Sequence, residues 1–143
     1  IDREQILIKE NKEDDFRRIL IPEPGSYVTA KGKIRISKET VAEDFKPSKE
    51  KHLITLDASN IKFPLTLRRT QQGDAFIPFG MKGRKLVSDY LTDRKRNLFE
   101  KQSQLILADS AGNILWLIGE RTSEDFRIKH TTETILKIEI VQD

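Results

Sequence analysis

Cysteine is absent from the 143-residue chain, and histidine occurs only twice. The lack of cysteine excludes disulfide bonds, thiolate catalysis and cysteine-ligated zinc sites, and it is typical of the reducing cytoplasm, where we expect the protein to act. His52 and His130 lie far apart and show no HxxH or HExxH spacing. We therefore predict no metal site and place both histidines on the surface.

Long apolar runs are missing as well. No run approaches the roughly 18 to 20 residues that span a bilayer, and the first ten residues, IDREQILIKE, lack the order of a signal peptide. We expect no membrane contact. The abrupt, charged start at Ile1 suggests that the chain is a part of something longer.

Motifs that carry catalysis are also scarce. The sequence contains neither a GxxxxGK[ST] phosphate loop nor a GxGxxG turn, and its acidic residues Asp74, Asp109 and Glu120 form no catalytic pattern. We predict no catalytic residues and no bound cofactor in this chain, which leaves its own status as an enzyme uncertain.

Hydrophobic residues make up 36% of the chain, enough for the core of one domain. Alternating or continuous apolar runs predict about seven strands, with Pro64 placing its strand at a sheet edge. A polar connector at 109–113 predicts a hairpin of buried strands, and we expect Trp116 in the core. The clearest predicted strands are 27–36, 53–57, 63–67, 105–108, 114–118 and 136–141.

One amphipathic helix is predicted within 84–95. Leu86, Val87, Tyr90 and Leu91 form its apolar stripe, and Lys85 is placed to pair with Asp89. Together these elements predict a single α+β domain over 1–143, with a mostly antiparallel, barrel-like sheet and one or two helices.

The positive charge is concentrated in one segment. Six basic and two acidic residues between Lys82 and Arg96 carry a net +4, whereas the other 128 residues carry −1 of the total +3. Such a concentration favours binding of polyanions. Glycines at 80 and 83 surround Lys82 just before the predicted helix, so the turn and the helix start could hold a phosphate. A tight loop with solvated lysines remains the alternative.

Ordered motifs add to this charge pattern. The sequence between about Leu53 and Ile140 resembles the C-terminal region of bacterial tRNA(Ile)-lysidine synthetase, and residues 1–50 carry little of the likeness. The segments that carry the resemblance are Asp57–Arg69, Gly73-Asp74, Pro78–Leu91, Ile114–Arg121 and Asp125–Ile128.

The resemblance implies an enzyme that uses ATP to join lysine to the wobble cytidine of tRNA(Ile). In that family an N-terminal catalytic domain bears a Ser-Gly-Gly-x-Asp-Ser loop, and this motif is missing here. ATP and lysine would therefore be used outside this fragment. The C-terminal region is understood to contact the tRNA acceptor stem, with a fold similar to a domain of the phenylalanine-specific tRNA-synthetase β-subunit.

The resemblance and the charge together assign RNA contacts to basic residues. Arg121 could instead form an ion pair with Glu124 or Asp125, and Phe99-Glu100-Lys101 stands where many relatives have an Arg-Asp pair. The candidates are, in order, Lys82, Arg84 and Lys85, then Arg94, Lys95 and Arg96, then Arg68, Arg69 and Arg121.

These assignments name tRNA(Ile) and the catalytic N-terminal domain of the same chain as partners, with a homodimer also open. A second hypothesis remains beside them. The domain could pack against its own catalytic domain or a second subunit without touching RNA.

Overall fold

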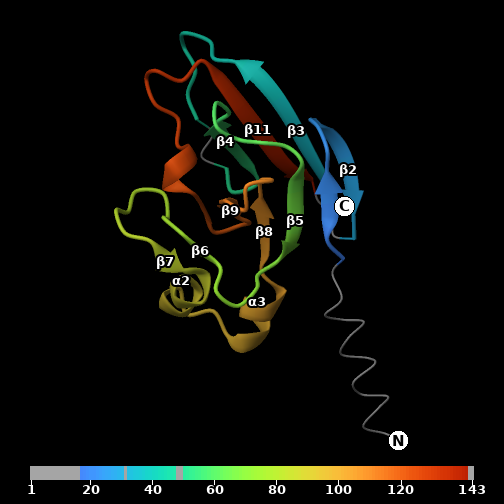
Figure 1. The fold of residues 1–143 in the computed structure, drawn as a ribbon, viewed down its shortest axis with the longest axis vertical. Helices are drawn as coiled ribbons and strands as arrows, with labels where there is room; N and C mark the ends of the chain where they lie inside the picture. The colour runs from blue at the N-terminus through green and yellow to red at the C-terminus, as the bar shows by residue number, and fades with distance from the viewer. Residues whose placement is uncertain (1–16, 31, 48–49, 142–143) are drawn as a thin grey trace, which may run out of the picture.

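The computed structural model describes residues 17–30, 32–47 and 50–141. Two antiparallel sheets pack around a shared core, and a small β-ribbon with two short helices lies at one end of the molecule (Figure 1). The two sheets are separate ladders and do not close into one hydrogen-bonded barrel within this part of the chain. The predicted α+β class with a mostly antiparallel sheet is confirmed.

The five-stranded sheet is built around the predicted hairpin. Its strand order is β1-β5-β8-β9-β10, and every neighbouring pair is antiparallel. The hairpin strands carry uninterrupted apolar residues because both of their faces are buried. The strands are β1 (Ile19–Ile21), β5 (Leu65–Arg69), β8 (Leu105–Ala108), β9 (Ile114–Leu117) and β10 (Arg121–Thr122).

The two faces of this hairpin belong to different hydrophobic clusters. Leu107 and Trp116 face the core shared with the second sheet, whereas Ile106 and Leu117 face the helical end. Trp116 is 2% exposed, which confirms its predicted place in the core. The hairpin is thus the common wall of both clusters.

The four-stranded sheet covers the first core cluster, in the order β2-β3-β11-β4. Strand β11 alternates as expected, because Leu136 and Ile138 are buried while Lys137 and Glu139 are partly exposed on the other face. Its strands are β2 (Gly25–Thr29), β3 (Gly32–Thr40), β4 (Leu53–Asp57) and β11 (Thr134–Val141).

The single strand predicted at 27–36 is wrong. The chain reverses between Thr29 and Gly32, so that Tyr27 pairs with Ile34 and Val28 pairs with Lys33. Gly32 has a φ of 127°, which a residue with a side chain rarely adopts. Ile34 faces the core as predicted, but Val28 is 77% exposed because it lies on an edge strand across the turn.

The predicted edge position of the strand near Pro64 is also wrong. Strand β5 begins at Leu65, one residue after the proline, and lies between β1 and β8. The missing N–H of Pro64 therefore interrupts no ladder.

The helical end contains β6 (Ala75–Phe76), β7 (Lys85–Leu86), α2 (Val87–Asp93) and α3 (Leu98–Ser103). Val87, Tyr90 and Leu91 are buried as the stripe predicted, but Leu86 is 44% exposed because it pairs with Ala75 before the helix begins. A capping box between Asn97 and Glu100 starts α3. No helix among the described residues is long and apolar enough to cross a membrane.

A carboxylate at the end of β4 ties the sheet to the loop before β11. Asp57 accepts hydrogen bonds from the Ser59 backbone at 2.9 Å, from the Ser59 hydroxyl at 2.6 Å and from the Thr132 hydroxyl at 2.9 Å. Partial burial raises the pKa of Asp57, but these hydrogen bonds and nearby Lys129 outweigh it and bring the pKa below its usual value.

Replacing Asp57 should therefore reduce stability in a pH-dependent way. We expect Asp57→Asn to lower the free energy of unfolding by about 1 kcal/mol at pH 7. A lowered pKa in the folded state gives stabilisation that is complete above about pH 3.9 and is lost as the pH falls through the folded value. Urea unfolding between pH 2 and 7 measures the difference. The exposed Asp44→Asn is the control, and a gap that widens in acid would contradict the assignment.

Candidate nucleic-acid interface

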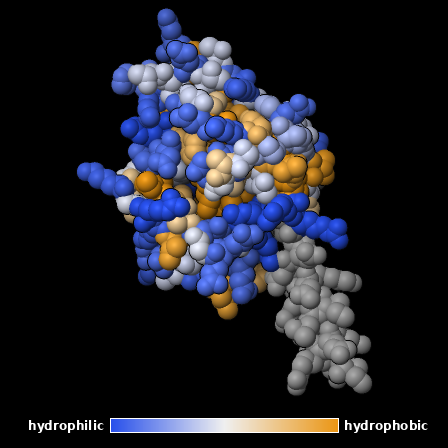
Figure 2. All heavy atoms as spheres, viewed as in Figure 1, coloured by the Kyte–Doolittle hydropathy of each residue, from blue (hydrophilic) through white to orange (hydrophobic). Residues whose placement is uncertain are grey.

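The first basic cluster consists of Lys82, Arg84 and Lys85. It lies on the loop between β6 and β7 and on the first residue of β7. Lys82 and Arg84 are exposed, and among the described residues neither has an ion-pair or hydrogen-bond partner. Figure 2 shows hydrophilic side chains projecting at the left of the molecule, where Figure 1 draws this loop. Both side chains are available to a polyanion.

The backbone of this loop is less available than its side chains. Gly80, with a φ of 85°, donates its N–H to Glu124 Oε1 at 2.9 Å. The helix begins at Val87 rather than directly after Lys85, and the Val87 N–H bonds to the Asp74 carbonyl at 2.9 Å. The expected backbone phosphate cradle is therefore already bonded at two of its N–H groups, and the loop offers mainly side-chain contacts.

Lys85 joins the two basic clusters. Its ammonium contacts the Asp93 carboxylate at the end of α2, and not Asp89 as the helical spacing predicted. Lys85 lies in β7, before the helix begins, so the four-residue spacing does not place its side chain next to Asp89 on a helix face. The Lys85–Asp93 contact brings the loop against the residues that follow α2.

The second basic cluster consists of Arg94, Lys95 and Arg96, in the turn that ends α2. The Lys95 N–H bonds to the Thr92 carbonyl, and the Arg96 N–H bonds to the Leu91 carbonyl, both at 2.9 Å. These are the two hydrogen bonds of a Schellman motif. Lys95 has a φ of 61°, in the left-handed position that glycine usually occupies.

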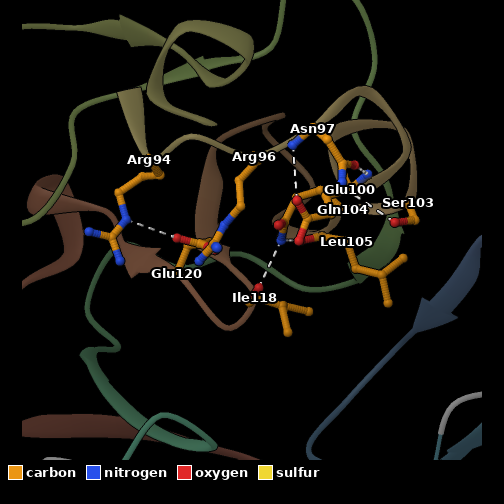
Figure 3. Close-up of polar contacts among 9 residues, drawn as sticks. All are labelled: Arg94, Arg96, Asn97, Glu100, Ser103, Gln104, Leu105, Ile118 and Glu120. Carbon is orange, nitrogen blue, oxygen red and sulfur yellow. Dashed lines mark hydrogen bonds and ion pairs between the residues drawn. The ribbon is translucent and has the colours of Figure 1, made fainter. Parts of the chain in front are cut away.

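A carboxylate more than twenty residues further along the chain holds the two arginines of this cluster. Glu120, in the turn between β9 and β10, accepts from Arg96 Nε at 2.8 Å and lies 3.4 Å from Arg94 Nε (Figure 3). Its side chain is 8% exposed, whereas those of Arg94 and Arg96 are 51% and 34% exposed. Hydrogen bonding to Glu120 and its charge raise the pKa of Arg96.

Arg68 lies in a different environment. It forms a two-point ion pair with Asp74, at 2.9 Å and 3.1 Å, and both side chains are largely buried. Asp74 also accepts from the Gln71 backbone, so the pair closes the loop between β5 and β6. Arg69 is half-buried beside it. This geometry indicates a structural role for Arg68.

Arg121 pairs with neither of its two predicted partners. Its guanidinium lies 5.8 Å from the centre of the Tyr90 ring and donates to the Phe79 carbonyl at 3.3 Å. Glu124 is instead bound by Arg127 at 2.8 Å. Arg121 follows Glu120 in the chain and lines an open groove beside β4.

Glu120 is the member of this cluster that sequence reasoning missed as an organiser. The only signal was its place next to Arg121 in a Gly-Glu-Arg motif, and its partners lie more than twenty residues away. No group of three or more histidines, aspartates or glutamates in the described segments could hold a metal ion.

Known relatives share much of this sequence. The chain is 44% identical over 103 residues to a tRNA(Ile)-lysidine synthase from Parabacteroides distasonis, a match covering 72% of the chain and 23% of that protein. It is 45% identical over 98 residues to the Bacteroides thetaiotaomicron synthase, covering 68% and 23%. This chain belongs to the tRNA(Ile)-lysidine synthase family. No protein-family model matches it.

Two solved structures share the fold of this chain. The crystal structure of the TILS C-terminal domain superimposes with a TM-score of 0.66 and 19% identity, covering 89% of this chain and 100% of that one. An N-terminal fragment of the phenylalanyl-tRNA synthetase β-subunit from Pyrococcus horikoshii gives 0.53 and 24%, covering 60% and 27%. Both fold likenesses implied by the sequence are confirmed. The chain spans about a quarter of the length of the lysidine synthases it matches.

The left-handed conformation of Lys95 leads to a stability prediction. We expect Lys95→Gly to raise the free energy of unfolding by about 1 kcal/mol, because glycine has no Cβ to strain this position. Lys101→Gly, in the interior of α3, should lower it by a similar amount. Thermal unfolding compares the two, and a Lys95→Gly protein less stable than wild type would contradict the geometry.

The ion pair between Arg68 and Asp74 leads to a second stability prediction for this region. Arg68→Ala leaves the largely buried Asp74 carboxylate without its charged partner and with the Gln71 N–H as a remaining donor. We expect a loss of about 2 kcal/mol in the free energy of unfolding measured in urea, less than for a fully buried pair. Arg35→Ala breaks an exposed pair with Glu139 and should cost less than about 0.5 kcal/mol. Equal effects from the two variants would show that Arg68 is not structural.

Proposed function

We propose that this chain is a tRNA-binding C-terminal domain of a lysidine synthase and that it contacts the acceptor stem of tRNA(Ile). The observation that carries the proposal is the joining of two basic clusters by the Lys85–Asp93 contact. Lys82 and Arg84 extend into solvent on one side, and Arg94 and Arg96 are held partly exposed on the other. Because the relatives of this chain are named as tRNA(Ile)-lysidine synthases, tRNA(Ile) is the nucleic acid that we expect this surface to bind.

In this proposal the chemistry of the whole synthase lies outside this chain. The sequence has no nucleotide-binding loop, so ATP and lysine would be bound by the part of the protein that makes up the remaining length of its relatives. In this proposal the domain raises the effective concentration of the tRNA and presents the distant anticodon to a catalytic domain. The parent enzyme would join lysine to the wobble cytidine in the cytoplasm.

Recognition through this surface would depend mainly on phosphates and 2′-hydroxyl groups. The deep, narrow major groove of duplex RNA does not admit side chains, whereas its backbone is accessible to arginine and lysine. Binding of this kind carries little sequence information and is strongly weakened by salt. The domain alone would then bind weakly and would add to the selectivity of the complete enzyme.

One observation favours the packing alternative. Helix α3 buries none of its residues, and Leu98 and Phe99 are 70% and 66% exposed. A six-residue helix gains little stability by itself, and apolar side chains on it are suited to contact with another protein surface. The basic surface and this apolar helix face are different parts of the same end, so both contacts can coexist.

The proposed function is tested by titrating tRNA(Ile) and an acceptor-stem minihelix by fluorescence anisotropy at several salt concentrations. We expect Lys82→Ala/Arg84→Ala to weaken binding and to make the log–log salt slope shallower by about 1.5, because each lost phosphate contact contributes about 0.7 to 0.9.

The matched control removes two exposed lysines from β3, which lies at the opposite end of the fold (Figure 1). Lys33→Ala/Lys38→Ala changes the net charge equally but should leave the slope nearly unchanged. Equal effects of the two double variants, or no RNA binding by the wild type, would remove the basis for the proposal and favour the packing alternative.

A further inference from the structure

The connection between α2 and α3 is anchored on both sides of its arginines. Before them, the Schellman hydrogen bonds fix the backbone at Lys95 and Arg96. After them, the Asn97–Glu100 capping box fixes the start of α3, and Gln104 Nε2 donates to the Ile118 carbonyl at 2.7 Å (Figure 3). The backbone that carries Arg94 and Arg96 is thus held against the β9–β10 hairpin.

The Glu120 carboxylate fixes the side chains on this backbone. Arg94 approaches it with Nε, and Arg96 approaches it with Nε and with Nη2, the latter at 2.6 Å. A guanidinium has five N–H donors, so both Nη groups of Arg94 and Nη1 of Arg96 remain for another acceptor. Figure 3 shows the two side chains converging on Glu120 from neighbouring positions of one segment.

We propose that Glu120 is a positioning residue that holds Arg94 and Arg96 as a rigid pair, and that this pair distinguishes double-stranded from single-stranded RNA. The inference rests on the proposed RNA-binding function. It gives an acidic residue a favourable role in binding a polyanion, which is opposite to the effect of its charge.

The physical reason is the cost of immobilising long side chains. A free arginine loses rotamer freedom when it binds a phosphate, whereas an arginine already held by Glu120 has lost most of that freedom in the folded protein. A rigid pair matches only phosphates whose spacing is itself rigid. The backbone of an RNA duplex meets this condition, while a single strand adapts equally well to mobile arginines.

The sign of the effect separates positioning from simple electrostatics. Glu120→Gln raises the net charge by one, so electrostatics alone predicts tighter binding to any RNA. Positioning predicts weaker binding to a duplex. Glu120→Asp keeps the charge but withdraws the carboxylate by one methylene, so electrostatics predicts no change and positioning again predicts weaker duplex binding.

The experiment measures anisotropy of the 143-residue chain with an acceptor-stem minihelix and with a single strand of equal phosphate number. We expect Glu120→Gln and Glu120→Asp to bind the minihelix about fivefold more weakly than wild type. On the single strand Glu120→Asp should be unchanged and Glu120→Gln unchanged or tighter. The charge control is Asp89→Asn on the exposed face of α2, which should bind both RNAs more tightly.

The outcomes distinguish positioning by Glu120 from simple electrostatics. Tighter or unchanged duplex binding by both Glu120 variants overturns the inference, and equal losses on both RNAs overturn the claim of duplex selectivity. Thermal unfolding establishes whether each variant is folded at the assay temperature. If Glu120→Gln is unfolded there, the result with Glu120→Asp tests the proposal. A wild type that binds neither RNA removes the proposed function as well, whereas normal wild-type binding with a tighter Glu120→Gln removes only the role of Glu120.

Discussion

Burial of both faces of the β8–β9 hairpin is the constraint on which the rest of the structure depends. Leu107 and Trp116 close the core between the two sheets, while Ile106 and Leu117 on the opposite face receive helix α2. The helical end therefore has a defined position relative to the sheets. Because the β9–β10 turn extends from the same hairpin, Glu120 reaches the residues that follow α2. The hairpin that forms the core also positions the candidate site.

Electrostatics divides the basic residues into groups with different roles. Lys82 and Arg84 are exposed and without ion-pair partners in the described part of the chain, so their charges act fully on the surroundings. Arg68 is neutralised locally by Asp74, and its charge stabilises a loop. Arg94 and Arg96 lie between these cases, because Glu120 removes part of their charge and holds them in place. The net charge of a sequence segment does not show which of its basic residues are free and which are paired.

Much of the fold could be predicted because hydrophobic patterns are local. Strand β4, strand β8 and the buried residues Val87, Tyr90 and Leu91 were all predicted, and Trp116 was placed correctly in the core. The turn after Thr29 was not predicted, since a tight hairpin continues the same alternation on both of its strands. For the candidate site, the exposure of Lys82 and Arg84 followed from a polar, glycine-containing loop. The pairing of Arg94 and Arg96 with Glu120 could not be foreseen.

The sequence by itself determined the class of the fold, the family and the segment in which positive charge is concentrated. These properties depend on composition, periodicity and ordered motifs, all of which are present in a linear chain. Only the tertiary structure decided which charges are free. An ion pair forms where two side chains meet within about 4 Å, and the contacts between Arg94, Arg96 and Glu120 join residues 24 and 26 positions apart. Sheet register and helix packing set those distances, so charges close together in sequence came to serve different purposes.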